Sequence, residues 1–418
     1  MKRVKTLGIA VALALSAAFP AAAADVTLGV NFGWSSPSEM AAIKVLQDHL
    51  AAEGIGWKDV QVVAHDTGST VSIMNMIAGG NPPDVFMASG FDPGLLRDLR
   101  DQGYGVSLTS FYKDLGATQH FPATVLQSLQ LDSDIVKAPL NVHIDGMLYY
   151  NTAVAKAAGV DPKSWKSLDD MFADYDKVKA AGFIPLALGG DRFQIAYLFQ
   201  ALMAAVTGGE IFDKVYGPKP DPAAFDTPAM RATLDMFRKF QQHTDPGSPN
   251  RPWNDTTNLV ITGKALMQIH GDWMKGEFVA AGKKLGPDFE CTNIPGTKGV
   301  VVTVDSWAFI KSNNPAVTKA QMALAKLVVD PSVSAEFSSH KGSTPVVDNA
   351  SAQYLDACNQ IVLNTLKDPS MQHLNPHNTA DADWLDATWD VENKFWQDPS
   401  ETDDQAIAAL HKAYDSMH

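Results

Sequence analysis

The stretch VTLGVNFGWSSPSEMAAIKVLQDHLAAE, residues 26–53, decides the fold. Its first seven residues, Val26–Phe32, are rich in apolar and β-branched side chains, which is typical of a strand. From Glu39 to Glu53 apolar residues such as Ile43 and Leu46 recur at helical spacing. A strand that leads directly into an amphipathic helix predicts the start of a parallel β-α-β unit.

The same alternation continues along the chain. After these two elements the sequence predicts further strands and helices in turn, a mainly helical central part at 152–285, and a late return of strand character. This order predicts an α/β protein without internal repeats or an obvious linker. The predicted elements are a strand at 60–64, a helix at 71–78, a strand at 83–88, helices at 93–102 and 168–181, a strand at 299–304 and a helix at 316–329.

The N-terminus carries the features of an export signal. A basic start at Met1–Lys5 is followed by an uncharged apolar stretch, Leu7–Phe19, and by the small residues Ala22–Ala24. We therefore expect residues 1–24 to be a signal peptide, with Asp25 as the mature N-terminus. The apolar stretch is too short for a membrane span, so we expect a soluble protein of the periplasm.

Composition limits the possible partners. The 418 residues carry a formal net charge of −14, with 45% hydrophobic and 19% charged residues. Such an acidic globular chain repels polyanions, so we expect no nucleic-acid partner.

The motifs GxxxxGK[ST], GxGxxG, HExxH and CxxC are all missing from the sequence. It therefore predicts neither a cofactor nor a metal site.

Cysteine usage fits the predicted compartment. The chain has two cysteines, Cys291 and Cys358. In an oxidising environment two thiols are more often paired than free, so we expect one disulfide. The alternative is two buried free thiols.

Several residue types suited to sugars are spread along the chain. Trp34 and Glu39 follow the first strand, Trp273 lies in Ile269–Trp273, and Asp305 ends a predicted strand. An aromatic ring presents a flat face to the C–H groups of a pyranose, while a carboxylate accepts hydrogen bonds from hydroxyl groups. Each residue also has an ordinary explanation, because tryptophan often packs in cores and aspartate often caps strands.

The order and spacing of five segments resemble the extracellular solute-binding proteins of bacterial ABC importers. The similarity covers nearly the whole mature chain and is greatest for the subgroup that binds glucose, mannose and related sugars. The segments that carry it are Trp34–Glu39, Asn81–Phe86, Pro139–Asn151, Gly263–Trp273 and Lys341–Pro345.

The resemblance implies a two-lobed periplasmic binding protein fold, type II-like, with the ligand in the cleft between the lobes. The N-lobe would hold residues 25–142 and 305–342, and the C-lobe residues 143–304 and 343–418. The chain would cross between the lobes near 140–146, near 301–305 and, for the third time, near 341–346. Family ligand-binding positions fall on Trp34, Glu39, Trp273, Asp305, Lys341 and His377. We expect His143, in the third of the matched segments, to bind the ligand as well.

Two departures from the glucose-binding pattern concern the pocket wall. Ser35 stands where those proteins have a second tryptophan, and Ser89 where they have a histidine. After His143 the chain continues with Ile144–Gly146 instead of a more basic, amide-rich run. The resulting space predicts that the sugar is not restricted to glucose and includes a larger or differently substituted glycoside.

Two functions of different classes fit these residues. The favoured one is a monomeric binding protein that captures a sugar and delivers it to a membrane permease. The alternative is an exported carbohydrate-active enzyme, because two carboxylates beside aromatic rings also make a glycosidase site. The sequence does not place Glu39 relative to Asp305, so it does not decide between them. A periplasmic scaffold or sensor partner is a third possibility and would need a docking surface.

Overall fold

The first sheet forms the core of one lobe. The computed structural model describes residues 26–61, 68–88 and 93–417. The strands of this sheet are β1 (Val26–Phe32), β2 (Ile55–Gln61), β3 (Val85–Met87), β6 (Ala138–Asp145), β11 (Val300–Phe309) and β12 (Gln372–Leu374). β1 pairs in parallel with both β2 and β3, as the predicted β-α-β units require, and it lies between them. Strand β11 lies between β3 and β6 and is antiparallel to both. Strand β12 pairs with the first residues of β11.

The second sheet forms the core of the other lobe. Its strands are β7 (Met147–Asn151), β8 (Ile184–Ala187), β9 (Ala265–His270) and β10 (Phe289–Thr292), in the order β10-β7-β9-β8. Of these, only β8 and β9 pair in parallel. A separate two-stranded ribbon in the first lobe joins β4 (Gln130–Leu131) to β5 (Asp134–Ile135).

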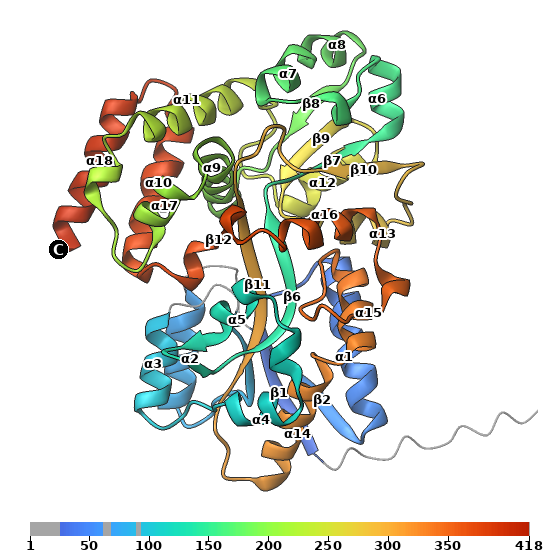
Figure 1. The fold of residues 1–418 in the computed structure, drawn as a ribbon, viewed down its shortest axis with the longest axis vertical. Helices are drawn as coiled ribbons and strands as arrows, with labels where there is room; N and C mark the ends of the chain where they lie inside the picture. Colours follow the sequence, from blue (N-terminus) through green and yellow to red (C-terminus); the bar gives the residue numbers. More distant parts are fainter. Residues whose placement is uncertain (1–25, 62–67, 89–92, 418) are drawn as a thin grey trace, which may run out of the picture.

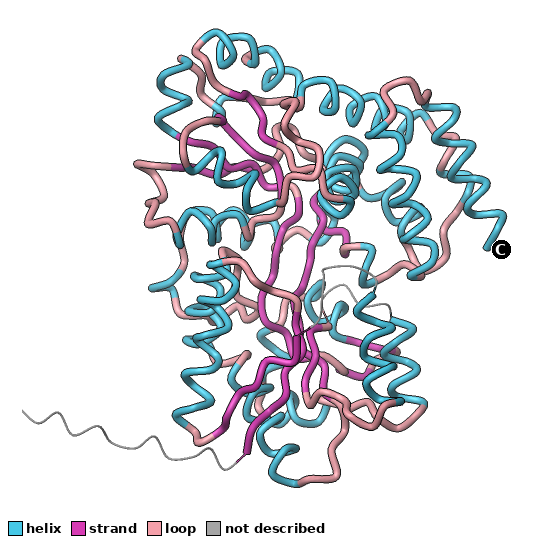
Figure 2. Tube along the Cα trace, turned by 180° about the vertical axis from the view of Figure 1, so that it is seen from behind, coloured by secondary structure: helices cyan, strands magenta, loops and turns pink. Residues whose placement is uncertain are grey.

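Two long strands connect the lobes. Figures 1 and 2 show β6 and β11 running side by side from one lobe into the other. Their pairing continues from Ala138–Trp307 to Asp145–Val301, with one irregularity between Asp305 and Ser306. The two crossings predicted near 140–146 and 301–305 are therefore a single hydrogen-bonded ribbon.

The third crossing lies against this ribbon. Val142 and Thr344 exchange backbone hydrogen bonds of 2.8 and 2.9 Å. Gly342, just before, has φ +87°, where a side chain would be strained. The architecture is thus the two-lobed α/β fold that the resemblance implies. The proposed lobe boundaries at 142, 304 and 342 stay a prediction, and residues 1–24 lie outside the described chain.

Seven helices flank the first sheet within the described residues. They are α1 (Pro37–Ala52), α2 (Gly68–Ala78), α3 (Pro93–Asp101), α4 (Thr109–Asp114), α5 (Ala123–Leu129), α14 (Pro315–Leu327) and α15 (Pro331–Lys341). A capping box fixes the start of α1, because the Ser36 hydroxyl accepts from the Glu39 N–H and the Glu39 carboxylate accepts from the Ser36 N–H. This cap begins the helix two residues earlier than its predicted start at Glu39.

The second lobe carries most of the remaining helices. They are α6 (Thr152–Ala158), α7 (Leu168–Ala173), α8 (Tyr175–Ala180), α9 (Arg192–Thr207), α10 (Gly209–Tyr216), α11 (Pro228–His243), α12 (Trp253–Ile261), α13 (Met274–Ala280), α16 (Ala357–Thr365), α17 (Ala382–Gln397) and α18 (Asp403–Met417). The single helix predicted at 168–181 is two helices that meet at Asp174. Its carboxylate accepts from Trp165 Nε1 at 2.8 Å, which ties the junction to the preceding loop.

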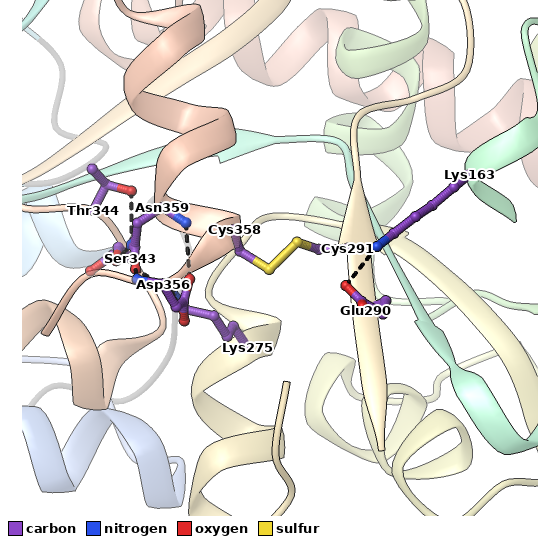
Figure 3. Close-up of a disulfide and its surroundings, with 9 residues drawn as sticks. All are labelled: Lys163, Lys275, Glu290, Cys291, Ser343, Thr344, Asp356, Cys358 and Asn359. Atoms are coloured by element: carbon purple, nitrogen blue, oxygen red, sulfur yellow. Dashed lines mark hydrogen bonds and ion pairs between the residues drawn. A yellow bond between two sulfur atoms is a disulfide. The ribbon is translucent and has the colours of Figure 1, made fainter. Parts of the chain in front are cut away.

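The expected disulfide is confirmed. Cys291 on β10 is bonded to Cys358 on α16, with their Cα atoms 6.0 Å apart (Figure 3). Next to it, the Asn359 side chain donates to the backbone oxygen of Ser343 at 2.7 Å. The disulfide therefore links α16 to the second sheet. Through Asn359, α16 also contacts the third crossing of the chain. In the described part of the chain, no helix combines the length and apolar character needed to cross a membrane.

Candidate functional site

The first lobe contributes Trp34, Glu39 and Lys341 to the site, and Lys341 contacts the other two. Glu39 lies in the first turn of α1, where its Oε2 atom accepts from the Ser35 and Ser36 N–H groups at 3.0 and 2.9 Å. Lys341 ends α15, and its Nζ atom lies 3.7 Å from Glu39 Oε1 and 4.5 Å from the Trp34 ring centroid. Both charged side chains are buried. Glu39 of the capping box thus forms an ion pair with Lys341, and this pair lies beside the Trp34 ring.

Trp273 approaches the same lysine from the second lobe. It lies between β9 and α13, and its ring centroid is 5.8 Å from Lys341 Nζ. The ring folds back over Gly271, where an added Cβ would lie 2.1 Å from a ring carbon. Glycine is therefore required at position 271 for this ring position. Two tryptophans from different lobes consequently flank one ammonium group.

His143 links two carboxylates at the centre of the site. Its Nδ1 atom bonds to Asp272, and its Nε2 atom lies 2.9 Å from Asp305 Oδ2. Burial lowers the pKa of His143, but the two carboxylates outweigh burial and raise it to about 9. Burial likewise raises the pKa of Asp305, yet His143 outweighs it and the pKa falls to about 2. At neutral pH the centre therefore holds an imidazolium between two carboxylates.

Asp145 is a further buried carboxylate on the same strand as His143. Its Oδ2 atom accepts from Thr303 Oγ1 and Asn375 Nδ2, both at 2.8 Å. Burial raises the pKa of Asp145 to about 7, although these two donors and His143 oppose the shift. Asn375 also shares a side-chain hydrogen bond with Tyr197 of α9.

His377 lies in an aromatic group on the second-lobe side. It belongs to the short helix η6 (Pro376–Asn378), and its ring centroid is 5.2 Å from that of Trp389 and 6.1 Å from that of Tyr197. The Tyr197 ring is in turn 6.1 Å from Trp273. Tyr197 thus connects His377 to the central residues.

The structure brings together most of the residues predicted from sequence. Of the two departures, the side chain of Ser35 is exposed and its N–H serves the cap of α1, while Ser89 lies outside the described residues. The predicted residues that form one connected group are Trp34, Glu39, His143, Trp273, Asp305 and Lys341, with His377 joined through Tyr197.

Sequence reasoning missed five residues of this group. Asp145 was visible only as part of the unusual run after His143, and Asp272 only as the neighbour of Trp273. Asn141 lies in the matched segment Pro139–Asn151, two residues before His143 and therefore on the same face of β6. Nothing in the sequence marks the remaining two, because tertiary packing brings them to the site. The missed residues are Asn141, Asp145, Tyr197, Asp272 and Asn375. Within the residues that the structure describes, no group of three His, Cys, Asp or Glu side chains could hold a metal ion.

The chain belongs to the family of bacterial extracellular solute-binding proteins. The family pattern matches residues 33–330. This membership confirms the class of protein expected from the resemblance, and it agrees with export from the cytoplasm. The finer assignment to the glucose- and mannose-binding subgroup stays a prediction.

Individual relatives agree with the family. A "probable sugar-binding periplasmic protein" of Mesorhizobium japonicum is 36% identical, covering 98% of this chain and 99% of that protein. A protein of Brucella melitensis with the same description is 32% identical, covering 80% of this chain and 78% of that protein.

Solved structures share the fold at low identity. The solute receptor AcbH, described as exclusively preferring β-D-galactopyranose, has a TM-score of 0.76 at 16% identity, covering 94% of this chain and 98% of its own. A chitin oligosaccharide binding protein also has a TM-score of 0.76, at 18% identity and 93% and 98% coverage. These two structures support the two-lobed fold.

Proposed function

We propose that this protein is the periplasmic component of an ABC importer that captures a sugar between its lobes and delivers it to the membrane permease. One observation carries the proposal: Lys341 Nζ lies within reach of an aromatic ring from each lobe, 4.5 Å from the ring centroid of Trp34 and 5.8 Å from that of Trp273. Relatives described as probable sugar-binding periplasmic proteins support the sugar class, and one described as an ABC transporter extracellular-binding protein supports the transporter.

The residues of the site suit a polyhydroxylated ligand. The two tryptophan rings offer flat faces for pyranose C–H groups. Around them, carboxylates accept from hydroxyl groups, while lysine donates to ring and hydroxyl oxygens. His143 has both ring nitrogens bonded to Asp272 and Asp305, so it orients these carboxylates toward the ligand. The proposed ligand-binding residues are Trp34, Ser35, Glu39, Ser89, His143, Trp273, Asp305, Lys341 and His377.

Capture requires that the lobes move. A ligand touched by residues of both lobes stabilises the closed arrangement relative to the open one. The permease would then distinguish loaded from empty protein by the relative position of the lobes, each protein acting as a monomer.

Binding without turnover is part of the proposal. A glycosidase needs one carboxyl that donates a proton and a second, ionised carboxyl across the bond. Asp305 does not suit the acid role, because its pKa is lowered to about 2 and it already accepts from Asn141 and His143. Membership of a solute-binding family supports the same conclusion.

A single experiment tests binding and turnover together. Purified mature protein is titrated calorimetrically with a panel of mono- and oligosaccharides, and each mixture is then analysed chromatographically for cleavage products. We expect saturable binding of at least one sugar and unchanged ligand after prolonged incubation. Product formation that requires Asp305 would establish the enzyme instead, and binding of no panel sugar would contradict the sugar class.

A further inference from the structure

The centre of the site holds more buried negative charge than positive charge. Asp145, Asp272 and Asp305 are 3%, 2% and 6% exposed. Among the described residues, the one cation hydrogen-bonded to any of them is His143, and the charge of Lys341 acts on Asp305 from a longer distance. Other buried cations of the described chain have partners of their own. Lys341 lies beside Glu39, Lys137 donates to Asn378, and Lys275 donates to Asp356 and Asn359.

Of these three carboxylates, Asp145 has a fully buried oxygen without a hydrogen-bond partner; elsewhere in the described chain Glu392 and Glu401 also have one. Thr303 and Asn375 both donate to its Oδ2 atom, whereas Oδ1 is buried and accepts from no group among the described residues. A buried carboxylate oxygen without a donor is costly, because it has lost water without gaining a replacement. The charged side chains that act on Asp145 are His143, which favours its ionisation, and Asp272, which opposes it.

The fold places this carboxylate beside the aromatic wall of the site. Gly146 follows Asp145 with φ +90°, and an added Cβ there would lie 2.7 Å from Cβ of Ala201 on α9. This close approach brings the end of β6 against α9. Tyr197 precedes Ala201 by one helical turn and therefore lies on the same face, toward Asp145. The Tyr197 ring also contacts the ring of Trp273, which lies beside the proposed sugar position.

We infer that the ligand is a sugar that carries a protonated amine, and that Asp145 Oδ1 binds this ammonium group. The inference rests on the proposed function and narrows its substrate class. A hydroxyl group would supply the missing hydrogen bond but no charge, whereas an ammonium group supplies both. Burial raises the pKa of Asp145 to about 7, and a neighbouring ammonium group would favour its ionised form.

Matched sugars test this inference by calorimetry in neutral buffer. Glucosamine, galactosamine and the disaccharide of glucosamine are each compared with their hydroxyl and N-acetyl counterparts. We expect an amine to bind at least about tenfold more tightly than both counterparts, as for a charged hydrogen bond. Asp145→Asn should remove that preference, whereas Thr303→Val, which leaves the charge in place, should keep it. Asp174→Asn, at the junction of α7 and α8, is the control for a change of net charge.

The outcomes separate the inference from the function on which it rests. If a neutral or N-acetylated sugar binds as tightly as its amine, the inference is wrong and the sugar-binding function stands. If no sugar of either kind binds, the proposed function fails as well. The wild-type preference decides the first point even if Asp145→Asn does not fold, and a folded Asp145→Asn variant that keeps the preference would overturn the role of Asp145.

Discussion

The ammonium group of Lys341 lies 4.5 Å from the centroid of the Trp34 ring. This contact joins the end of α15 to the loop after β1, two segments about three hundred residues apart in the sequence. A buried lysine beside an aromatic face gains a cation–π interaction in addition to its ion pair with Glu39. These two contacts fix the position of the lysine from within the protein, which lowers the entropic cost of binding.

Replacement of Lys341 by methionine should weaken sugar binding without unfolding the protein. Methionine keeps an apolar chain of similar shape but loses the charge, so we expect a loss of about 1.5–3 kcal/mol, or roughly ten- to a hundredfold in affinity. Calorimetric titration measures the change. Lys326→Met, on the exposed surface of α14, is the matched control and should bind as the wild type does. Equal affinities in the two variants would contradict the assigned role.

Trp273 and Trp253, two tryptophans of the second lobe, should differ in their effects on binding. We expect Trp273→Ala to cost about 1–3 kcal/mol of binding energy, because a stacking face is lost. Trp253→Ala should cost less, since that ring is buried at the start of α12, 6.3 Å from His270. Both affinities are compared by titration at a temperature where thermal unfolding shows each variant folded. Equal losses would count against the position of the site.

His143 should make the stability of the protein fall at alkaline pH. Its pKa in the folded state is about 9, above the ordinary value of 6.5. The stabilisation is therefore fully present below the unfolded pKa and is lost as pH rises through about 9. Urea unfolding across this range measures it. Asp145 acts in the same direction, so the decisive quantity is the difference between wild type and His143→Gln, which should shrink toward alkaline pH.

Loss of the disulfide should destabilise the second lobe. The bond joins residues 67 apart in sequence, and closing such a loop stabilises by about 2–4 kcal/mol. Urea unfolding of the Cys291→Ser, Cys358→Ser double variant should show this loss. A reducing agent should lower the unfolding midpoint of wild type and leave that of the double variant unchanged. No difference between the two proteins would show that packing alone holds α16 on β10.

Sugar binding should bring the lobes closer together. Small-angle scattering is expected to give a smaller radius of gyration with the bound sugar than without it. Bending should concentrate where the ribbon is irregular, between Asp305 and Ser306, and near Gly342 in the third crossing. Tight binding at an unchanged radius would refute closure, and Lys341→Met at the same sugar concentration serves as the weakly loaded control.

The sequence predicted the α/β class and the position of most elements, because strand and helix periodicities are local properties. It placed the second strand at 60–64, whereas the structure has β2 at Ile55–Gln61 and does not describe residues 62–67. The error follows from Gly54, at φ +76°, which ends the preceding helix sharply and lets the strand begin at once.

Site residues could be predicted from the sequence only where the residue type itself indicates sugar binding. Tryptophans and charged residues in the matched segments identified Trp34, Trp273 and Lys341. Tyr197 and Asn375 carry no such signal, because their roles depend on how α9 and the segment after β12 pack against the ribbon. Long-range packing of this kind is not encoded in a local pattern.

The central place of β11 in the first sheet has a consequence for how the protein is made. This strand lies between β3 and β6, yet it ends only at Phe309. A chain still under synthesis therefore has β3 and β6 with unpaired edges until about three quarters of it has been translated. The sheet of the first lobe can therefore be completed only late in synthesis, after most of the second lobe's strands have been made.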